Sequence, residues 1–294
     1  MTKSKFFPYL EAGFAATVWG ASFIATKVAL KDISPITIVW MRFAMGVIIL
    51  GLAVALRKQF ALPNKNEWGY FALLGFLGIT FHQWLQSNAL KTSEASTTAW
   101  IVATTPVFMA LLGWLILKER LNGIKTVGIL LAFIGVLLVV SDGDLASISI
   151  GKFGAPGDIL ILISSINWAV FSALSRRGLK KYSASLMIFY VMLLGWIFSS
   201  VLFIGGGNYV EIAALSVNGW LGVLFLGVFC SGLAYIAWYD ALQALSTAET
   251  GVFLYIEPLI AMVVAFFILG EPITVASVFG GGVILFGVWL VNKG

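Results

Sequence analysis

The sequence is poor in the residue types that carry most enzyme chemistry and metal binding. Among its 294 residues it has one histidine, His82, and one cysteine, Cys230. They form no His or Cys cluster for a metal, and a single cysteine excludes an internal disulfide. No Walker loop, Gly-x-Ser-x-Gly elbow or intramembrane metalloprotease motif is present. We therefore expect neither an enzyme nor an ATP-driven machine, and no cofactor.

Charge is scarce as well. Only 11% of the residues are charged, whereas 60% are hydrophobic, and the mean hydropathy is +1.00. Soluble domains average about 25% charged and about 45–50% apolar residues. The composition thus excludes a soluble protein of this size and predicts a lipid bilayer as its environment.

Long apolar runs predict an all-α membrane protein with ten transmembrane helices, because a span needs roughly 20 mostly apolar residues. The connections are short, and the longest, at residues 141–157, separates two halves. The predicted spans are 9–30, 36–56, 67–88, 95–117, 124–141, 156–176, 185–204, 217–239, 247–269 and 275–292.

The chain contains an internal repeat. Residues 66–140 align with 218–292 at a constant offset and without a gap. The sequence therefore predicts two five-helix units, 1–145 and 146–294. Because five is odd, the second unit enters the membrane from the opposite side, which gives the inverted repeats typical of carriers. Aligned pairs are Pro106/Pro258, Glu119/Glu271, Gly128/Gly280, Gly135/Gly287 and, at a slightly different offset, Trp19/Trp168.

Basic residues in the loops predict the orientation, because cytoplasmic loops carry an excess of Lys and Arg. With both termini cytoplasmic, thirteen basic residues lie inside: Lys3, Lys5, Arg57, Lys58, Lys65, Lys118, Arg120, Lys125, Arg176, Arg177, Lys180, Lys181 and Lys293. Four lie outside: Lys27, Lys31, Lys91 and Lys152. This asymmetry accounts for the net charge of +5, which therefore does not indicate binding of nucleic acid.

Several short motifs resemble one family. They are Trp19-Gly20-Ala21-Ser22-Phe23 with Lys27, Met41-Arg42-Phe43, Asn88-Ala89-Leu90, Ala95-Ser96, Pro106-Val107-Phe108 and Leu117-Lys118-Glu119-Arg120-Leu121, then Ala241-Leu242, Glu257-Pro258 and Leu269-Gly270-Glu271-Pro272. In order, spacing and duplication they resemble the EamA branch of the drug/metabolite transporter superfamily. The resemblance implies a ten-helix inner-membrane carrier, often an exporter of amino acids or other small metabolites.

Pro106 and Pro258 lie near the centres of their spans. Proline removes a backbone donor and kinks a helix, so these positions are expected to act as hinges or to open the bundle, unless they serve packing alone. Glu257 adjoins Pro258 at mid-span, where a carboxylate is costly. It is either a proton-coupling or amine-binding group or a structural carboxyl that bonds the backbone freed by the proline.

The third span carries a polar stripe. His82 and Gln86 share one helical face with Gly75 and Gly78, since steps of three and four residues keep to one face. We expect His82 and Gln86 to bind substrate, and His82 is a second candidate for proton coupling. The alternative is a packing histidine.

Three tryptophans are candidates for a substrate pocket, because aromatic faces beside hydroxyls suit apolar or cationic solutes. Trp19 and Trp168 are equivalent mid-span residues, and the third is Trp100; core packing is the alternative for each. The accompanying hydroxyl residues are Ser164, Ser172 and Ser175 beside Trp168, and Thr97 and Thr104 beside Trp100.

The remaining candidates lie near span ends. Tyr235 and Tyr239 share a face and are either interfacial anchors or a cytoplasmic gate that contacts substrate. Arg42 is expected to reach towards the interface or a backbone carbonyl, with binding of a substrate carboxylate as the alternative. Glu119 and Glu271 are expected to be structural anchors.

Together these features predict a secondary carrier of small organic solutes. The family resemblance implies export, and a coupled ion is expected to be a proton. The alternatives are a membrane-embedded enzyme acting on lipid-linked substrates, a pore, or a non-transporting regulatory membrane subunit. The substrate itself does not follow from the sequence.

Overall fold

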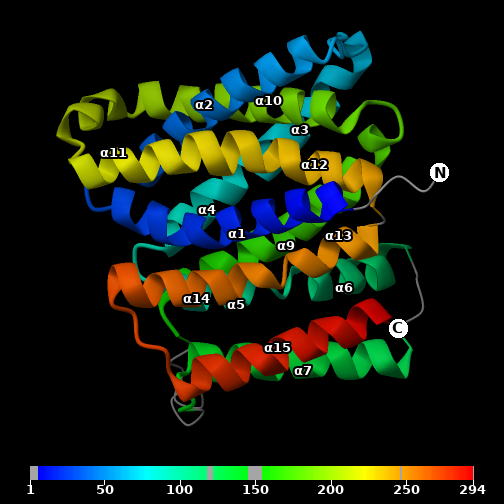
Figure 1. Ribbon diagram of the computed structural model, residues 1–294, viewed down its shortest axis with the longest axis vertical. Helices are drawn as coiled ribbons and strands as arrows, with labels where there is room; N and C mark the ends of the chain where they lie inside the picture. Colours follow the sequence, from blue (N-terminus) through cyan, green and yellow to red (C-terminus); the bar gives the residue numbers. More distant parts are fainter. Residues whose placement is uncertain (1–5, 118–121, 145–153, 246, 294) are drawn as a thin grey trace.

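The protein is a bundle of helices that run across its long axis (Figure 1). The computed structural model describes residues 6–117, 122–144, 154–245 and 247–293, and within these ranges it contains no strand. Its α-helices are α1 (Phe6–Ala29), α2 (Pro35–Leu56), α3 (Trp68–Gly75), α4 (His82–Ala89), α5 (Ala95–Val102), α6 (Thr105–Leu117), α7 (Gly123–Val140), α9 (Pro156–Leu179), α10 (Ala184–Gly205), α11 (Val217–Leu224), α12 (Ala234–Ala244), α13 (Thr247–Phe253), α14 (Ile256–Leu269) and α15 (Val275–Lys293). Two π-helical segments, η2 (Phe76–Phe81) and η4 (Phe225–Leu233), and two 3₁₀ segments, η1 (Lys65–Glu67) and η3 (Asn208–Ala214), complete the described chain.

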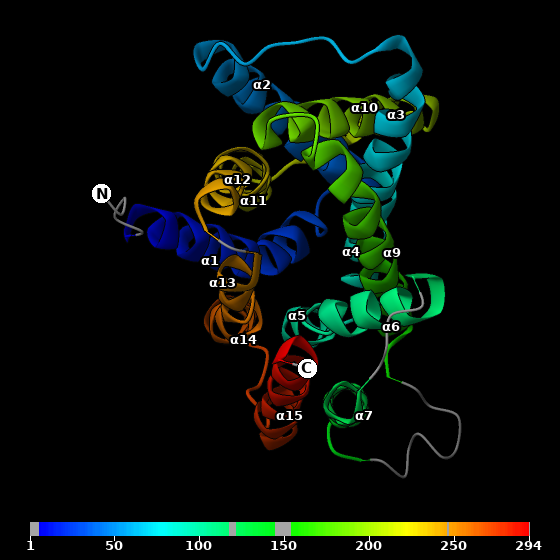
Figure 2. The same cartoon turned by 90° about the vertical axis from the view of Figure 1, so that its right-hand side faces the viewer.

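Every predicted span coincides with a helix or with a run of consecutive helical segments. Eight helical stretches in the described residues are long and apolar enough to cross a membrane. The other two predicted spans, α1 and the run α3–η2–α4, are helical and pack within the same bundle (Figure 2). The protein is therefore a multi-pass membrane protein.

Side-chain caps start equivalent helices in the two halves of the chain. The Asn122 side chain accepts a hydrogen bond from the backbone N–H of Lys125 at 2.9 Å and begins α7. Thr274, at the equivalent position, accepts from the backbone N–H of Ser277 at 3.0 Å and begins α15. Such caps satisfy one of the unpaired donors of a first helical turn. Local sequence signals thus set where both helices begin.

Helices α7 and α15 pack side by side through glycines (Figures 1 and 2). A Cβ placed on Gly128 would lie 2.6 Å from the carbonyl oxygen of Gly287, and one on Gly135 would lie 2.7 Å from that of Gly280. Small residues allow such close backbone approach between membrane helices. In the repeat, Gly128 aligns with Gly280 and Gly135 with Gly287. Gly128 therefore contacts the equivalent of Gly135, and Gly135 contacts the equivalent of Gly128.

Glu271, between α14 and α15, ties three parts of the bundle together. Its carboxylate pairs with Lys27 Nζ at 2.9 Å and accepts the backbone N–H groups of Ala95 and Ser96 at 2.8 and 3.1 Å. Burial opposes ionisation, but the hydrogen bonds from Ala95, Lys27 and Ser96 outweigh it and hold the pKa of Glu271 below its usual value. The prediction of a structural anchor is confirmed for Glu271. Its equivalent, Glu119, lies outside the described residues.

Candidate functional site

Arg42 of α2 is a charged side chain in the interior of the bundle. Only 4% of it is exposed. Its Nε donates to Ser231 Oγ and its Nη1 to Gln83 Oε1, each at 2.9 Å. Both partners are neutral, and no acidic side chain in the described residues pairs with the guanidinium. Arg42 is thus a buried cation without a counter-ion in this part of the chain.

The expectation that Arg42 reaches the interface or a backbone carbonyl is wrong. The guanidinium points inward because helices on either side of α2 offer side-chain acceptors there. Gln83 lies in α4 directly after η2, and Ser231 lies within η4. Gln83 and Ser231 are not among the predicted site residues, although Gln83 adjoins the polar stripe that carries His82.

The two π-helical segments occur at nearly equivalent places in the repeat. The repeat offset of residues 66 and 218 carries η2, Phe76–Phe81, onto residues 228–233, which lie within η4, Phe225–Leu233. A π-helical turn rotates all later residues of the helix to a different face, and such turns often occur at functional sites. Helical periodicity in the sequence cannot show such a turn, so it did not reveal that Gln83 and Ser231 converge on Arg42.

His82 and Trp168 pack together on the side of α4 and α9. Their ring centroids lie 4.6 Å apart, and His82 Nδ1 shares a hydrogen bond with Ser164 Oγ at 2.8 Å. The His82 side chain is buried. Gln86 and Ser172 are half-buried on the same two helices. The structure therefore brings together one group of the predicted binding residues.

Trp19 and Tyr235 form a second group, where α1 meets η4 and α12. The Trp19 ring lies 5.4 Å from the Tyr235 ring and 5.3 Å from the Trp238 ring. Trp19 Nε1 donates to the carbonyl of Cys230 at 3.0 Å. Tyr235 is only 5% exposed, so it lies within the bundle and is not an interfacial anchor.

One hydrophobic cluster connects the two groups. Phe43, Phe171 and Tyr235 are buried members of it, and both Trp19 and Trp168 pack against it. Phe43 is the chain neighbour of Arg42, whose guanidinium carbon lies 5.0 Å from the Phe43 ring centroid. The aromatic residues and the buried cation thus share one neighbourhood.

Trp100 and Thr104 lie in a different part of the core. Trp100 is fully buried in a cluster with residues of α7 and α15, and a Cβ on Gly281 would collide with its ring. The hydroxyl of Thr104 donates to the carbonyl of Ile101 at 2.6 Å. Both placements favour the packing alternative, and their binding role remains a prediction.

The two central prolines each follow a break in a helix. Pro106 is the second residue of α6, after α5 has ended at Val102, and Pro258 is the third residue of α14, after α13 has ended at Phe253. The Thr105 hydroxyl donates to the carbonyl of Val102 at 2.7 Å, the acceptor that Pro106 deprives of its helical donor. The predicted interruptions are present at equivalent places, and movement about them remains a prediction.

Glu257 is the repeat equivalent of Thr105, but its side chain does not hydrogen-bond the backbone as that of Thr105 does. Its carboxyl makes no hydrogen bond or ion pair within the described chain, so the expected structural bond to freed backbone is not observed. Its backbone oxygen would lie 2.6 Å from a Cβ on Gly20, which places it against α1 beside Trp19. The backbone at Glu257 therefore adjoins the helix that carries Trp19.

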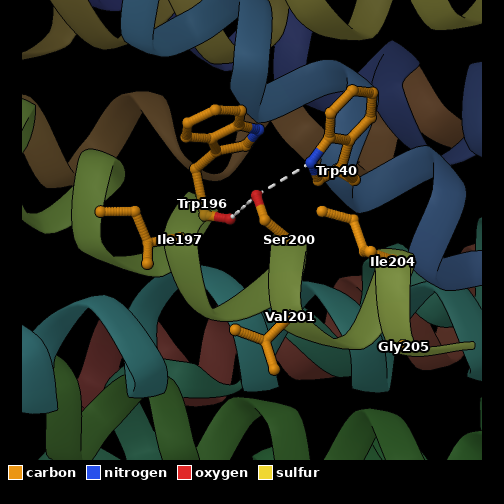
Figure 3. A pocket seen from close by; sticks show the side chains of 7 residues that line it. All are labelled: Trp40, Trp196, Ile197, Ser200, Val201, Ile204 and Gly205. Atoms are coloured by element: carbon orange, nitrogen blue, oxygen red, sulfur yellow. Dashed lines mark hydrogen bonds between the residues drawn. The ribbon is translucent and has the colours of Figure 1, made fainter.

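An open apolar groove of about 530 Å³ lies elsewhere, between α2 and α10 (Figure 3). Trp40 Nε1 donates to Ser200 Oγ at 2.9 Å across it. Ile197, Val201 and Ile204 are exposed, so this groove faces lipid in a membrane. It contains none of the predicted site residues. No group of three or more His, Cys, Asp or Glu side chains in the described ranges could hold a metal.

Comparisons with known proteins agree with one another. The EamA-like transporter family matches residues 8–141 and again residues 155–293. An "Uncharacterized transporter" of Archaeoglobus fulgidus is 32% identical over 286 residues, covering 97% of this chain and 96% of that protein. The "Uncharacterized transporter YyaM" of Bacillus subtilis is 28% identical, covering 92% and 88%. A crystal structure that is 18% identical matches 98% of this chain with a TM-score of 0.68, and it shows the fold alone.

Proposed function

Because the chain belongs to the EamA-like transporter family, we propose that it is a secondary carrier of small organic solutes. One observation carries this proposal. Arg42 is buried and Glu257 half-buried in an apolar helical bundle, and neither has an ionic partner in the described chain. Ionisable groups are costly inside membranes and commonly mark substrate or ion pathways. The solute binds between α1, α2, α4, α9 and α12, against Trp19, Trp168 and Tyr235.

We also propose that the chain consists of two inverted five-helix repeats, 1–145 and 146–294, that rock about the bound solute. Three features support this organisation: the crossed glycine pairs of α7 and α15, the matched π-helical segments, and the helix breaks before Pro106 and Pro258. Carriers of this design expose a central site alternately to the two sides of the membrane.

A membrane-embedded enzyme is the weaker candidate. His82 is bonded to Ser164, and this pair has no activated nucleophile or metal-ligand set beside it in the described structure. A regulatory subunit or an open pore would not need matched interruptions in both halves. Outward transport and proton coupling are further parts of the proposal, and both rest on analogy with the family.

The proposed location is the inner membrane with both termini cytoplasmic, supported by the distribution of Lys and Arg. On a Cys230→Ser background, Lys91→Cys should react with a membrane-impermeant thiol reagent in intact cells. Lys180→Cys should react only after permeabilisation. Both side chains are exposed at chain turns, so access depends on the side of the membrane. The reverse labelling pattern would overturn the orientation.

Binding is the first test of the proposed function. A thermal-shift screen of the purified protein against amino acids, purines, sugars and quaternary amines should find a stabilising solute. Trp19→Ala and Trp168→Ala should weaken its binding roughly 10-fold or more, because each removes apolar contact area. Trp84→Ala, on the exposed face of α4, serves as the control. Equal weakening by all three variants would assign the tryptophans to packing.

A further inference from the structure

The guanidinium of Arg42 has unused donor capacity. Arginine carries five N–H donors, and Ser231 and Gln83 each take one. Nη2 makes no hydrogen bond within the described chain. Nη2 is also not among the fully buried side-chain polar atoms that lack a partner in the described residues. Nη2 is therefore open to a small molecule or water.

The unused donors have a definite geometry. Nε is taken by Ser231 and one N–H of Nη1 by Gln83, so the free N–H groups belong to Nη1 and Nη2. These two nitrogens form the end of the guanidinium fork. The fork matches two oxygens held on one carbon or phosphorus atom. The two neutral partners hold Arg42 in place, and Nη2 stays unbonded within the described structure.

We propose that this fork binds a carboxylate of the transported solute. The inference rests on the proposed function and deepens it by assigning the substrate class. A buried charge without a partner is strongly unfavourable, and a solute carboxylate would supply the missing negative charge. The solute thereby gains two charge-assisted hydrogen bonds in a setting from which water is largely excluded.

Local charge favours a carboxylate over a phosphate. One guanidinium balances one negative charge, whereas a phosphate monoester near neutral pH carries between one and two. Lys27 pairs with Glu271, so its charge is already balanced and does not serve a second negative charge at Arg42.

The same surroundings accept the remainder of such a solute. Trp19, Trp168 and Tyr235 present aromatic surface, and Glu257 presents an unbonded carboxyl. These groups suit an apolar body or an ammonium. A solute with a carboxylate at one end and an apolar or cationic remainder therefore fits both the Arg42 guanidinium and the aromatic surface beside it. Amino acids meet this description.

The test compares acids with their amides. Each of the twenty common amino acids and its α-carboxamide is measured by thermal shift on the wild-type protein, with methyl phosphate as a further probe. We expect at least one acid to bind and its amide to bind roughly 100-fold more weakly, because the amide lacks the charge. Arg42→Gln should lose the preference for the acid, and Arg42→Lys should keep part of it. Arg177→Gln, an exposed cation outside the site, should leave it unchanged.

Several results would overturn the assignment. They are equal binding of acid and amide, a preference for methyl phosphate, an Arg42→Gln variant that retains the preference, or failure of every acid to bind. If Arg42→Gln does not fold, the comparison of acid with amide on the wild-type protein still tests whether binding requires a carboxylate. Should only sugars, purines or quaternary amines bind, the role of Arg42 fails while the carrier proposal stands. Should no solute bind or be transported, the carrier proposal fails as well.

Discussion

Replacing Gly287 by leucine is expected to prevent stable folding. A Cβ at this position would lie 2.6 Å from both the backbone nitrogen of Ala132 and the carbonyl oxygen of Gly128. Backbone atoms cannot rotate away as a flexible side chain can, so α7 and α15 must separate. Overpacking of a core costs typically about 1–3 kcal/mol and sometimes more. A collision with two backbone atoms of α7 belongs at or above the upper end of that range.

The matched control is Gly282→Leu on the same helix. No atom lies within 4 Å of a Cβ placed on Gly282, and this residue is exposed. Yield of monodisperse protein in mild detergent and its thermal unfolding midpoint measure the difference. Gly287→Leu should give little folded protein, whereas Gly282→Leu should resemble wild type. Similar behaviour of the two variants would show that this glycine contact does not hold α7 against α15.

Loss of proton-driven accumulation is the second large effect that we expect, in Glu257→Gln. The carboxyl of Glu257 has no bond within the described chain, whereas its equivalent Thr105 satisfies the backbone near its own proline. Glutamine retains the shape but cannot exchange a proton. In proteoliposomes with a pH gradient, accumulation of a solute found by the thermal-shift screen should fall at least about 10-fold, as a coupling role requires. Exchange of the solute without a gradient should persist.

His82→Gln provides the second arm of this experiment, because His82 is the other ionisable candidate. The exposed Glu94 gives a control variant, Glu94→Gln, which removes a carboxylate at the end of the bundle. Wild-type accumulation in both Glu257→Gln and His82→Gln would exclude these residues as the coupling site. A Glu257→Gln protein that does not fold would instead favour a structural role for this carboxyl.

Much of the architecture could be predicted because its causes are local. Apolar runs gave the helical segments to within a few residues, and the helix breaks before Pro106 and Pro258 lie at the aligned positions where proline predicts a kink. Glu271 could be identified as an anchor from its place beside a short loop. Each of these features depends on neighbouring residues or on a repeated pattern, both of which are visible in one sequence.

The site was less accessible to prediction because it depends on contacts between distant segments. Ser231 contacts Arg42 although the two residues are 189 positions apart in the sequence. Ser231 lies in a π-helical segment, which helical periodicity in the sequence does not reveal. Trp19 and Trp168, both predicted to line a pocket, pack against one hydrophobic cluster, and their binding role remains a prediction. Trp100 has an equally suitable local pattern, yet it packs against Gly281. Local patterns cannot distinguish a residue that faces a site from one that fills the core.

Counterflow in proteoliposomes is the most direct test of a carrier. Vesicles containing the purified protein are loaded with an excess of a solute found by the thermal-shift screen and diluted into a trace of the same labelled solute. A protein that exposes one site alternately to the two sides predicts a transient, saturable accumulation of label above its equilibrium level, which disappears when the internal solute is omitted. Equilibration without an overshoot, or no uptake beyond that of protein-free vesicles, would contradict the account.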